Sequence, residues 1–95
     1  MAHISREELL ERLQAATAVV TVGKYYKHTK SGGRYKVLGL GIDEKAEKVQ
    51  VQYQEIDHDP PITWHRHFDG EDGWITPTEI DGKPAPRFTF IGDSV

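Results

Sequence analysis

Gly23-Lys24-Tyr25-Tyr26-Lys27-His28 opens the stretch of sequence that indicates the fold. It begins a half of the chain in which aromatic and β-branched residues alternate with short turn sequences. Ser31-Gly32-Gly33 is a tight-turn signal between predicted strands at 25–29 and 34–42. Residues 49–53 alternate apolar and polar side chains, as expected of a strand with one buried face. Further strands are predicted at 62–68 and 87–91.

A short helix is predicted before this strand-rich part. Ser5 and Glu8 fit a capping box, in which the serine hydroxyl accepts from the Glu8 amide and Glu8 reaches back. Leu9 and Leu13 follow helical spacing, so the helix should run from about Arg6 to Ala16. Residues 17–22 are then rich in β-branched side chains and are expected to lead into a strand.

These elements predict a mainly β fold, with about five or six short strands, about ten residues apart, forming a small barrel or roll behind one N-terminal helix. Ninety-five residues are too few for two independent cores. We therefore expect a single domain over 1–95, with a helical extension at 1–17 and a β-barrel at 18–95.

The composition excludes several classes of site. The chain has no cysteine, which rules out disulfides, thiolate zinc sites and cysteine nucleophiles. Neither a signal peptide nor an apolar run of membrane-spanning length is visible, so a soluble, cytoplasmic protein is expected. The net charge of −3 disfavours a general nucleic-acid binder. Between Lys24 and Lys36, however, there are five Lys/Arg and no acid, so part of the surface is expected to be positive.

Four pieces of the sequence, in order, resemble a domain-of-unknown-function family numbered 1653. They are G-K-Y-Y-K-H-T-K-S-G-G-R-Y-K-V-L-G-L-G at 23–41, V-Q-V-Q-Y-Q-E at 49–55, W-H-R at 64–66 and D-G-K-P-A-P-R-F at 81–88. The resemblance covers 23–91, and His67 stands where the family usually has proline. It implies an SH3-like β-barrel of bacterial or phage origin. The family has no established activity, so the resemblance implies no catalytic role.

The first candidate ligand-binding residues surround the opening motif. On a strand, Tyr26 and His28 share one face and Tyr25 and Lys27 share the other, with Tyr35 on the next strand. Aromatic and cationic side chains left on an open face can stack on a ligand and neutralise its charge. The alternative is that the tyrosines pack a small core and the lysines only solvate its outside.

Two arginines are candidates for holding an anion. Arg66 alternates with Trp64, taken as a buried aromatic, so their side chains should share a face, whereas Arg87 should face away from Phe88. Arg66 and Arg87 can each clamp a carboxylate or phosphate. An internal ion pair with an acid is the competing interpretation, and the candidate acids are Asp57, Asp59 and Glu79.

His65 and His67 are weak candidates for a metal site. Histidines two apart on a strand point the same way and can chelate one ion. No third ligand stands at a diagnostic spacing, so neither a physiological metal nor another cofactor is predicted.

The favoured hypothesis is a non-enzymatic binding or adaptor module that recognises a small anionic ligand, a peptide or a protein. One alternative is a nucleic-acid-binding accessory domain, because Lys24–Lys36 is locally basic and small barrels often serve that role. Another is an enzyme that uses His28 with a carboxylate. No membrane partner is expected, and the chain is either a monomer or a homodimer through the N-terminal helix.

Overall fold

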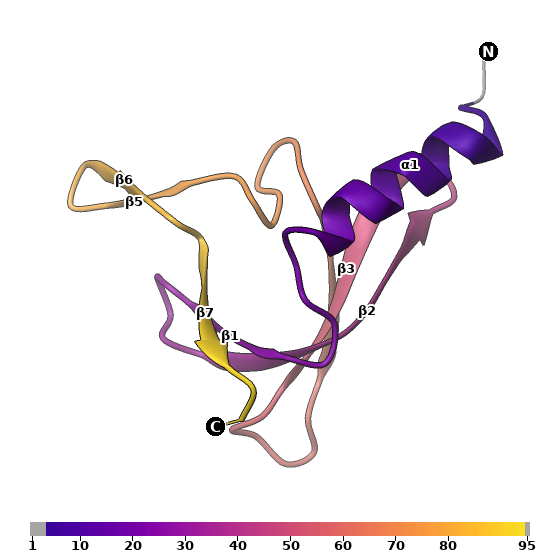
Figure 1. The fold of residues 1–95 in the computed structure, drawn as a ribbon. Coiled ribbons are helices and arrows are strands. Elements are labelled where there is room, and N and C mark those ends of the chain that lie inside the picture. The colour runs from indigo at the N-terminus through magenta and orange to yellow at the C-terminus, as the bar shows by residue number, and fades with distance from the viewer. Residues whose placement is uncertain (1–3, 95) are drawn as a thin grey trace.

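The chain forms a five-stranded sheet crossed by one helix, together with a separate two-stranded hairpin (Figure 1). A computed structural model describes residues 4–94. Residues 1–3 and 95, which belong to the predicted 1–17 and 18–95 units, lie outside the described residues. The helix α1 spans Arg6–Thr17, and the strands are β1 (Tyr25–His28), β2 (Arg34–Asp43), β3 (Lys48–Glu55), β4 (Thr63–His67), β5 (Thr78–Ile80), β6 (Lys83–Ala85) and β7 (Phe88–Gly92).

The sheet is antiparallel and open. Its strand order is β4-β3-β2-β1-β7, so β4 and β7 are the two edges and, within residues 4–94, the sheet does not close into a barrel. A bulge between Val37 and Gly39 interrupts the β2–β3 pairing. The β5–β6 hairpin extends away from the sheet (Figure 1). A mainly β fold behind one helix is therefore confirmed, in the form of an open, curved sheet.

The core lies on the face of the sheet that carries alternate residues of β3. Val49, Val51 and Tyr53 are buried, while Gln50 and Gln52 between them are partly exposed. The central cluster combines small aliphatic side chains with four aromatic rings. Its buried members are Val20, Tyr26, Val37, Val51, Tyr53, Trp74 and Phe88.

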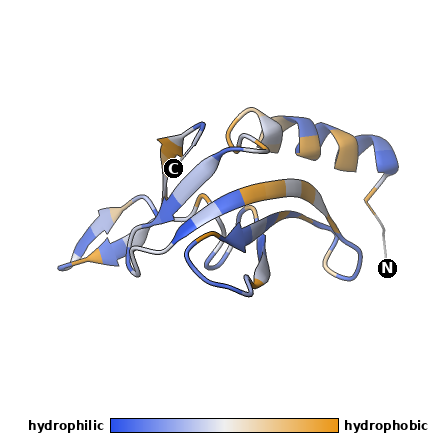
Figure 2. Cartoon of the chain, turned by 90° about the horizontal axis from the view of Figure 1, so that it is seen from below, coloured by the Kyte–Doolittle hydropathy of each residue, from blue (hydrophilic) through white to orange (hydrophobic). Residues whose placement is uncertain are grey.

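Helix α1 begins with the serine cap that the sequence predicts. The Glu8 amide donates to Ser5 Oγ over 3.1 Å. The Glu8 carboxylate pairs with Arg12, one turn along. The helix packs on β2 and β3 (Figure 2), with Ala16 completely buried. Leu9 and Leu13 are only half-buried, and most of the remaining helix surface is exposed.

The expectation that residues 17–22 lead into a strand is wrong. The helix runs on to Thr17, and the chain then turns, with the amides of Val19 and Val20 both donating to the Ala16 carbonyl. This turn places Val20 in the core and leaves Val19 and Val22 exposed. In this segment a β-branched residue, Val20, contributes to the buried core, and the segment does not pair as a strand.

None of the helices formed by residues 4–94 combines the length and the apolar character needed to cross a bilayer.

Candidate functional site

A stack of aromatic rings forms the floor of the candidate site. The rings of Trp74 and Phe88 lie parallel, with centroids 3.7 Å apart and an interplanar angle of 2°. Tyr53 meets both rings edge-on, at centroid distances of 5.1 Å to Trp74 and 5.6 Å to Phe88. Each such contact contributes about 0.5–1.5 kcal/mol beyond the burial of area. The floor therefore joins β3, β7 and the loop before β5.

A small pocket opens on one side of this floor, at the β4 end of the core. We call it the His28–Arg66 pocket, and its volume is about 190 Å³. Strands β1, β2, β3, β4 and β7 each contribute a side chain, and the β1–β2 turn contributes a serine. The lining residues are His28, Ser31, Tyr35, Tyr53, Trp64, Arg66 and Phe88.

Arg66 is the cation of this pocket. Its Nε donates to the Tyr53 hydroxyl over 3.3 Å, and its Nη1 donates to the backbone carbonyl of Asp72 over 2.6 Å. The guanidinium carbon lies over the Phe88 ring, 5.4 Å from the centroid. Within residues 4–94, no carboxylate forms an ion pair with Arg66. Neutral groups thus fix its position, and its charge stays available to a ligand.

His28 is oriented by the turn that follows β1. Its Nδ1 lies 2.9 Å from Ser31 Oγ and accepts from the Ser31 amide over 3.2 Å. Because Nδ1 is an acceptor in that bond, the neutral ring carries its proton on Nε2. The ring also meets Phe88 edge-on, with centroids 5.0 Å apart. His28 therefore supplies an N–H donor beside the guanidinium.

The surroundings of His28 are cationic. Burial of the ring lowers the pKa of His28 below its ordinary value of 6.5, and the charges of Arg66, Arg87 and Lys30 lower it further. The catalytic alternative needs a carboxylate beside this ring, yet within residues 4–94 none makes a hydrogen bond to it. A neutral imidazole next to an uncompensated guanidinium suits binding of a negative charge.

This lowered pKa predicts a pH dependence of stability. As the pH falls through and below 6.5, the unfolded chain takes up a proton at position 28 before the folded chain does. The free energy of unfolding should therefore fall over that interval. His28→Asn, whose amide oxygen replaces the Nδ1 acceptor, should fall less steeply. Urea unfolding of both proteins at a series of pH values measures the difference, and equal slopes would contradict it.

The predicted ligand-binding residues divide into three groups. His28, Tyr35, Trp64 and Arg66 meet in the His28–Arg66 pocket, although Trp64 is 44% exposed rather than buried. Its indole N–H donates to Glu55 over 3.2 Å. The second group comprises Tyr25 and Lys27, which point to the opposite face of β1, as their spacing predicts. Tyr25 there lies 6.0 Å from the Lys36 ammonium.

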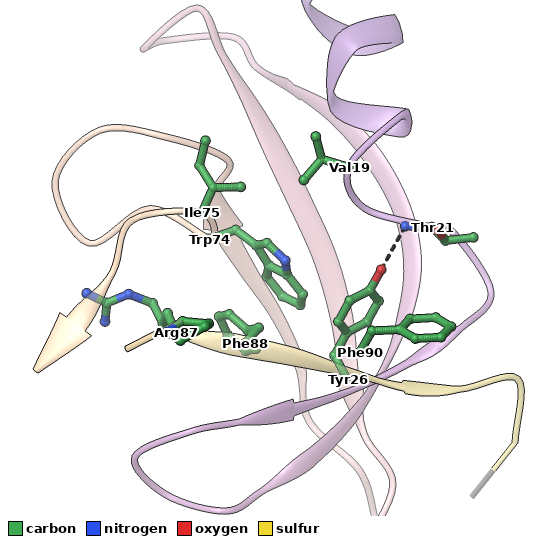
Figure 3. Close-up of a pocket in the computed structure, with 9 residues that line it drawn as sticks. Val19, Thr21, Tyr26, Trp74, Ile75, Arg87, Phe88 and Phe90 are labelled. Atoms are coloured by element: carbon green, nitrogen blue, oxygen red, sulfur yellow. Dashed lines mark hydrogen bonds between the residues drawn. The ribbon is translucent and has the colours of Figure 1, made fainter. Parts of the chain in front are cut away.

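Tyr26 and Arg87, the third group, line a different hollow on the other side of the Trp74–Phe88 stack (Figure 3). We call it the β7-edge groove, and its volume is about 480 Å³. The Tyr26 hydroxyl accepts from the Thr21 amide over 3.0 Å, which fixes the turn after α1. The groove is lined by Val19, Thr21, Tyr26, Trp74, Ile75, Pro86, Arg87, Phe88 and Phe90.

The acids proposed as internal partners of the arginines are not the ones used. Arg87 donates to the Thr76 carbonyl over 3.0 Å and approaches the Asp72 carboxylate at 3.4 Å. Asp57 instead forms a two-bond pair with Arg34. Asp72 therefore serves both arginines, through its carbonyl for Arg66 and its carboxylate for Arg87.

The two strand histidines do not build a metal site. His67 Nε2 lies 2.9 Å from the Asp43 carboxylate, and this bond helps to lower the pKa of Asp43. His65 is exposed. Among residues 4–94, no cluster of three or more His, Asp or Glu side chains is placed to hold a metal ion.

The basic segment is partly neutralised by acids from elsewhere in the chain. Lys24 pairs with Asp93 at 3.1 Å, and Arg34 pairs with Asp57. These contacts reduce the positive charge that the segment can offer to a phosphate backbone.

Sequence reasoning missed four residues of the site. Tyr53 and Phe88 fit the apolar alternation of buried strands, and Ser31 fits a turn. Their positions in the sequence are therefore explained without any role in a site. The signal for Tyr53 was its β3 position, which antiparallel pairing with β4 places opposite Trp64. Asp72, with a positive φ of 55°, gives no comparable signal.

Comparison with known proteins gives a family match. A family described as "Protein of unknown function (DUF1653)" matches residues 24–90, which is more than half of the chain. No curated protein and no solved structure matches.

Proposed function

We propose that this chain, which belongs to the DUF1653 family of proteins of unknown function, is a binding module that holds an anionic group of its ligand in the His28–Arg66 pocket. The observation that carries the proposal is the Arg66 guanidinium, which is fixed by Tyr53 and the Asp72 carbonyl with no acid paired to it among residues 4–94. A cation held without a counter-charge is prepared to receive one. His28 and Ser31 add polar atoms on the β1–β2 side.

The size of the pocket limits what enters it. Sites for whole small molecules usually measure about 300–1,000 Å³, whereas this pocket measures about 190 Å³. A single carboxylate or phosphate fits that space, with the remainder of the ligand outside. The exposed indole of Trp64 at the rim offers a surface for an apolar or flat part of the ligand.

A nucleic-acid ligand has less support. Such binding relies on several unpaired cations along one surface, and two of the five cations of the basic segment are paired with acids. We therefore make the phosphate of a nucleotide one arm of the test rather than a second proposal.

The proposal predicts that anion binding depends on Arg66. Inorganic phosphate and acetate, and the same groups on a nucleotide and on an acidic peptide, should shift the NMR amide signals of residues 28, 31 and 66. Arg66→Met should weaken binding by about ten- to a hundredfold, because a hydrogen bond to a charged group contributes about 1.5–3 kcal/mol. The control variant is Arg34→Met, which removes an exposed arginine already paired with Asp57. This variant should bind anions as the original chain does.

Two results would count against the proposal. One is the absence of shifts at these positions with every anion at constant ionic strength. The other is equal binding by the Arg66→Met and Arg34→Met variants. Each variant loses one positive charge and salt screens both alike, so equal binding would mean that position 66 has no specific role.

A further inference from the structure

His28 and Arg66 rest against the same aromatic ring. The imidazole meets Phe88 edge-on with centroids 5.0 Å apart, and the Arg66 guanidinium carbon lies 5.4 Å from the Phe88 centroid. Both side chains line the His28–Arg66 pocket, one from β1 and the other from β4. The pocket therefore places a group that can gain a positive charge beside one that always carries it.

The β1–β2 turn can hold His28 in both of its protonation states. In the neutral ring, Nδ1 accepts from the Ser31 amide over 3.2 Å. Ser31 Oγ lies 2.9 Å from the same nitrogen and also accepts from the Gly33 amide. A serine hydroxyl both donates and accepts, so Oγ can accept an N–H bond from Nδ1 once the ring is protonated. Nε2 carries a proton in either state, and no group among residues 4–94 accepts it.

The charges that act on His28 come from three elements, and all of them are positive. They belong to Arg66 on β4, Arg87 before β7 and Lys30 in the β1–β2 turn. Burial of the ring lowers the pKa of His28, and repulsion by these charges lowers it further. An anion bound between the ring and the guanidinium offsets this repulsion and attracts a proton to the ring.

Two acids near the pocket are engaged with other partners. Glu55, at the rim, accepts from the Trp64 indole and from a backbone amide. The Asp72 carboxylate approaches Arg87 at 3.4 Å. Neither carboxylate makes a hydrogen bond to His28. The other titratable side chains of the pocket are phenols, those of Tyr35 and Tyr53. The negative charge that favours a protonated His28 is therefore the one that a ligand brings.

We propose, on the basis of the function proposed above, that the His28–Arg66 pocket takes up the anionic group of its ligand together with a proton from water. The proton binds to Nδ1 of His28 and is donated to Ser31 Oγ, while Nε2–H and the Arg66 guanidinium both donate to the anion. The coupling is reciprocal, so a bound proton raises the affinity for the anion by the same factor as the anion raises the affinity for the proton. Binding strengthens as the pH falls, and the ligand is released as the pH rises.

Sulfate is the probe for this coupling, because its charge stays constant over the pH range used. Its dissociation constant, measured from the NMR amide signals of residues 28, 31 and 66 at constant ionic strength, should fall about tenfold between about pH 8 and about pH 5.5. The ring signals of His28 should titrate at higher pH with saturating sulfate than without it, a result that needs no variant. His28→Asn should show equal dissociation constants at the two pH values, because asparagine does not titrate. Circular dichroism at both pH values checks that each protein is folded.

The matched control is His65→Asn, which removes an exposed histidine of β4 and should keep the full pH dependence. A pH dependence that His28→Asn retains, or that His65→Asn removes, overturns the inference. Sulfate binding that requires Arg66 but is equal at both pH values, with an unmoved His28 titration, also overturns it and leaves the proposed function intact. If Arg66→Met binds sulfate as tightly as the original chain, the inference and the proposed function both fail.

Discussion

Replacing Trp74 with alanine is expected to lower the free energy of unfolding by about 3–5 kcal/mol, the usual loss for a large aromatic removed from a core. Trp74 is only 4% exposed, it stacks on Phe88 at 3.7 Å, and it meets Tyr26 and Tyr53 edge-on. Its removal leaves a cavity among rings that β1, β3 and β7 hold in place. Domains are stable by about 5–15 kcal/mol, so the variant loses a large share of its stability.

The matched control is the other tryptophan. Trp64→Ala removes a side chain that is 44% exposed and should cost less than about 1 kcal/mol. Thermal unfolding followed by circular dichroism measures both, and Trp74→Ala should melt at least about 12 °C lower than the original chain. Similar losses for the two variants would mean that the aromatic stack is not the centre of the core.

Gly73→Ala should give the second large effect. A Cβ at this position lies 2.5–2.6 Å from backbone atoms of Asp69, far inside contact distance. The loop over 69–73 must therefore move, and forced packing of this kind costs about 1–3 kcal/mol. That loop contains Asp72, whose carbonyl holds Arg66. It leads directly into Trp74, whose amide donates to the His67 carbonyl. We expect lower stability together with weaker anion binding.

Gly41→Ala is the control for this substitution. A Cβ there comes no closer than 4.0 Å to the Gln52 side chain, which is ordinary contact. Its effect on stability should stay below about 1 kcal/mol in either direction. Chemical unfolding and the phosphate titration, run on both variants, separate the two consequences. Stable folding of Gly73→Ala with unchanged anion binding would contradict the role given to this loop.

Elements whose cause is local could be predicted from the sequence. The Ser5 cap and the apolar spacing set the helix, because the Ser5 hydroxyl accepts from the Glu8 amide in the first turn. The β3 strand follows from the alternation of valine and glutamine, because one face must be buried. The Ser31-Gly32-Gly33 turn supplies a glycine with a φ of 76°, which only glycine adopts without strain.

Features that depend on distant parts of the chain could not be predicted in the same way. Val20 reads as part of a strand, but its burial under the sheet is decided by where α1 packs. Arg87 has several acids available by composition, and only the path of the loop after β4 brings Asp72 to it. The openness of the sheet likewise depends on how β4 and β7 are placed in space, which strand patterns do not encode.

For the same reason, only part of the candidate site could be predicted from the sequence. Tyr26 and His28, and likewise Trp64 and Arg66, were correctly assigned to shared faces by the two-residue period of a strand. The assembly of His28 on β1 with Arg66 on β4 required the full strand order, since β2 and β3 lie between these two strands. Tyr53 and Phe88 were overlooked because one side chain can both pack the core and line a pocket.

The contrast between the two tryptophans has a practical consequence. Trp74 is shielded by Tyr26, Tyr53 and Phe88, while Trp64 stands at the rim of the His28–Arg66 pocket and reaches the solvent. Their fluorescence therefore reports on separate events in one molecule. We expect the emission of buried Trp74 to follow unfolding, and we expect a soluble quencher to reach Trp64 until the proposed ligand covers it. The chain thus contains its own optical probes for folding and for pocket occupancy, without any added label.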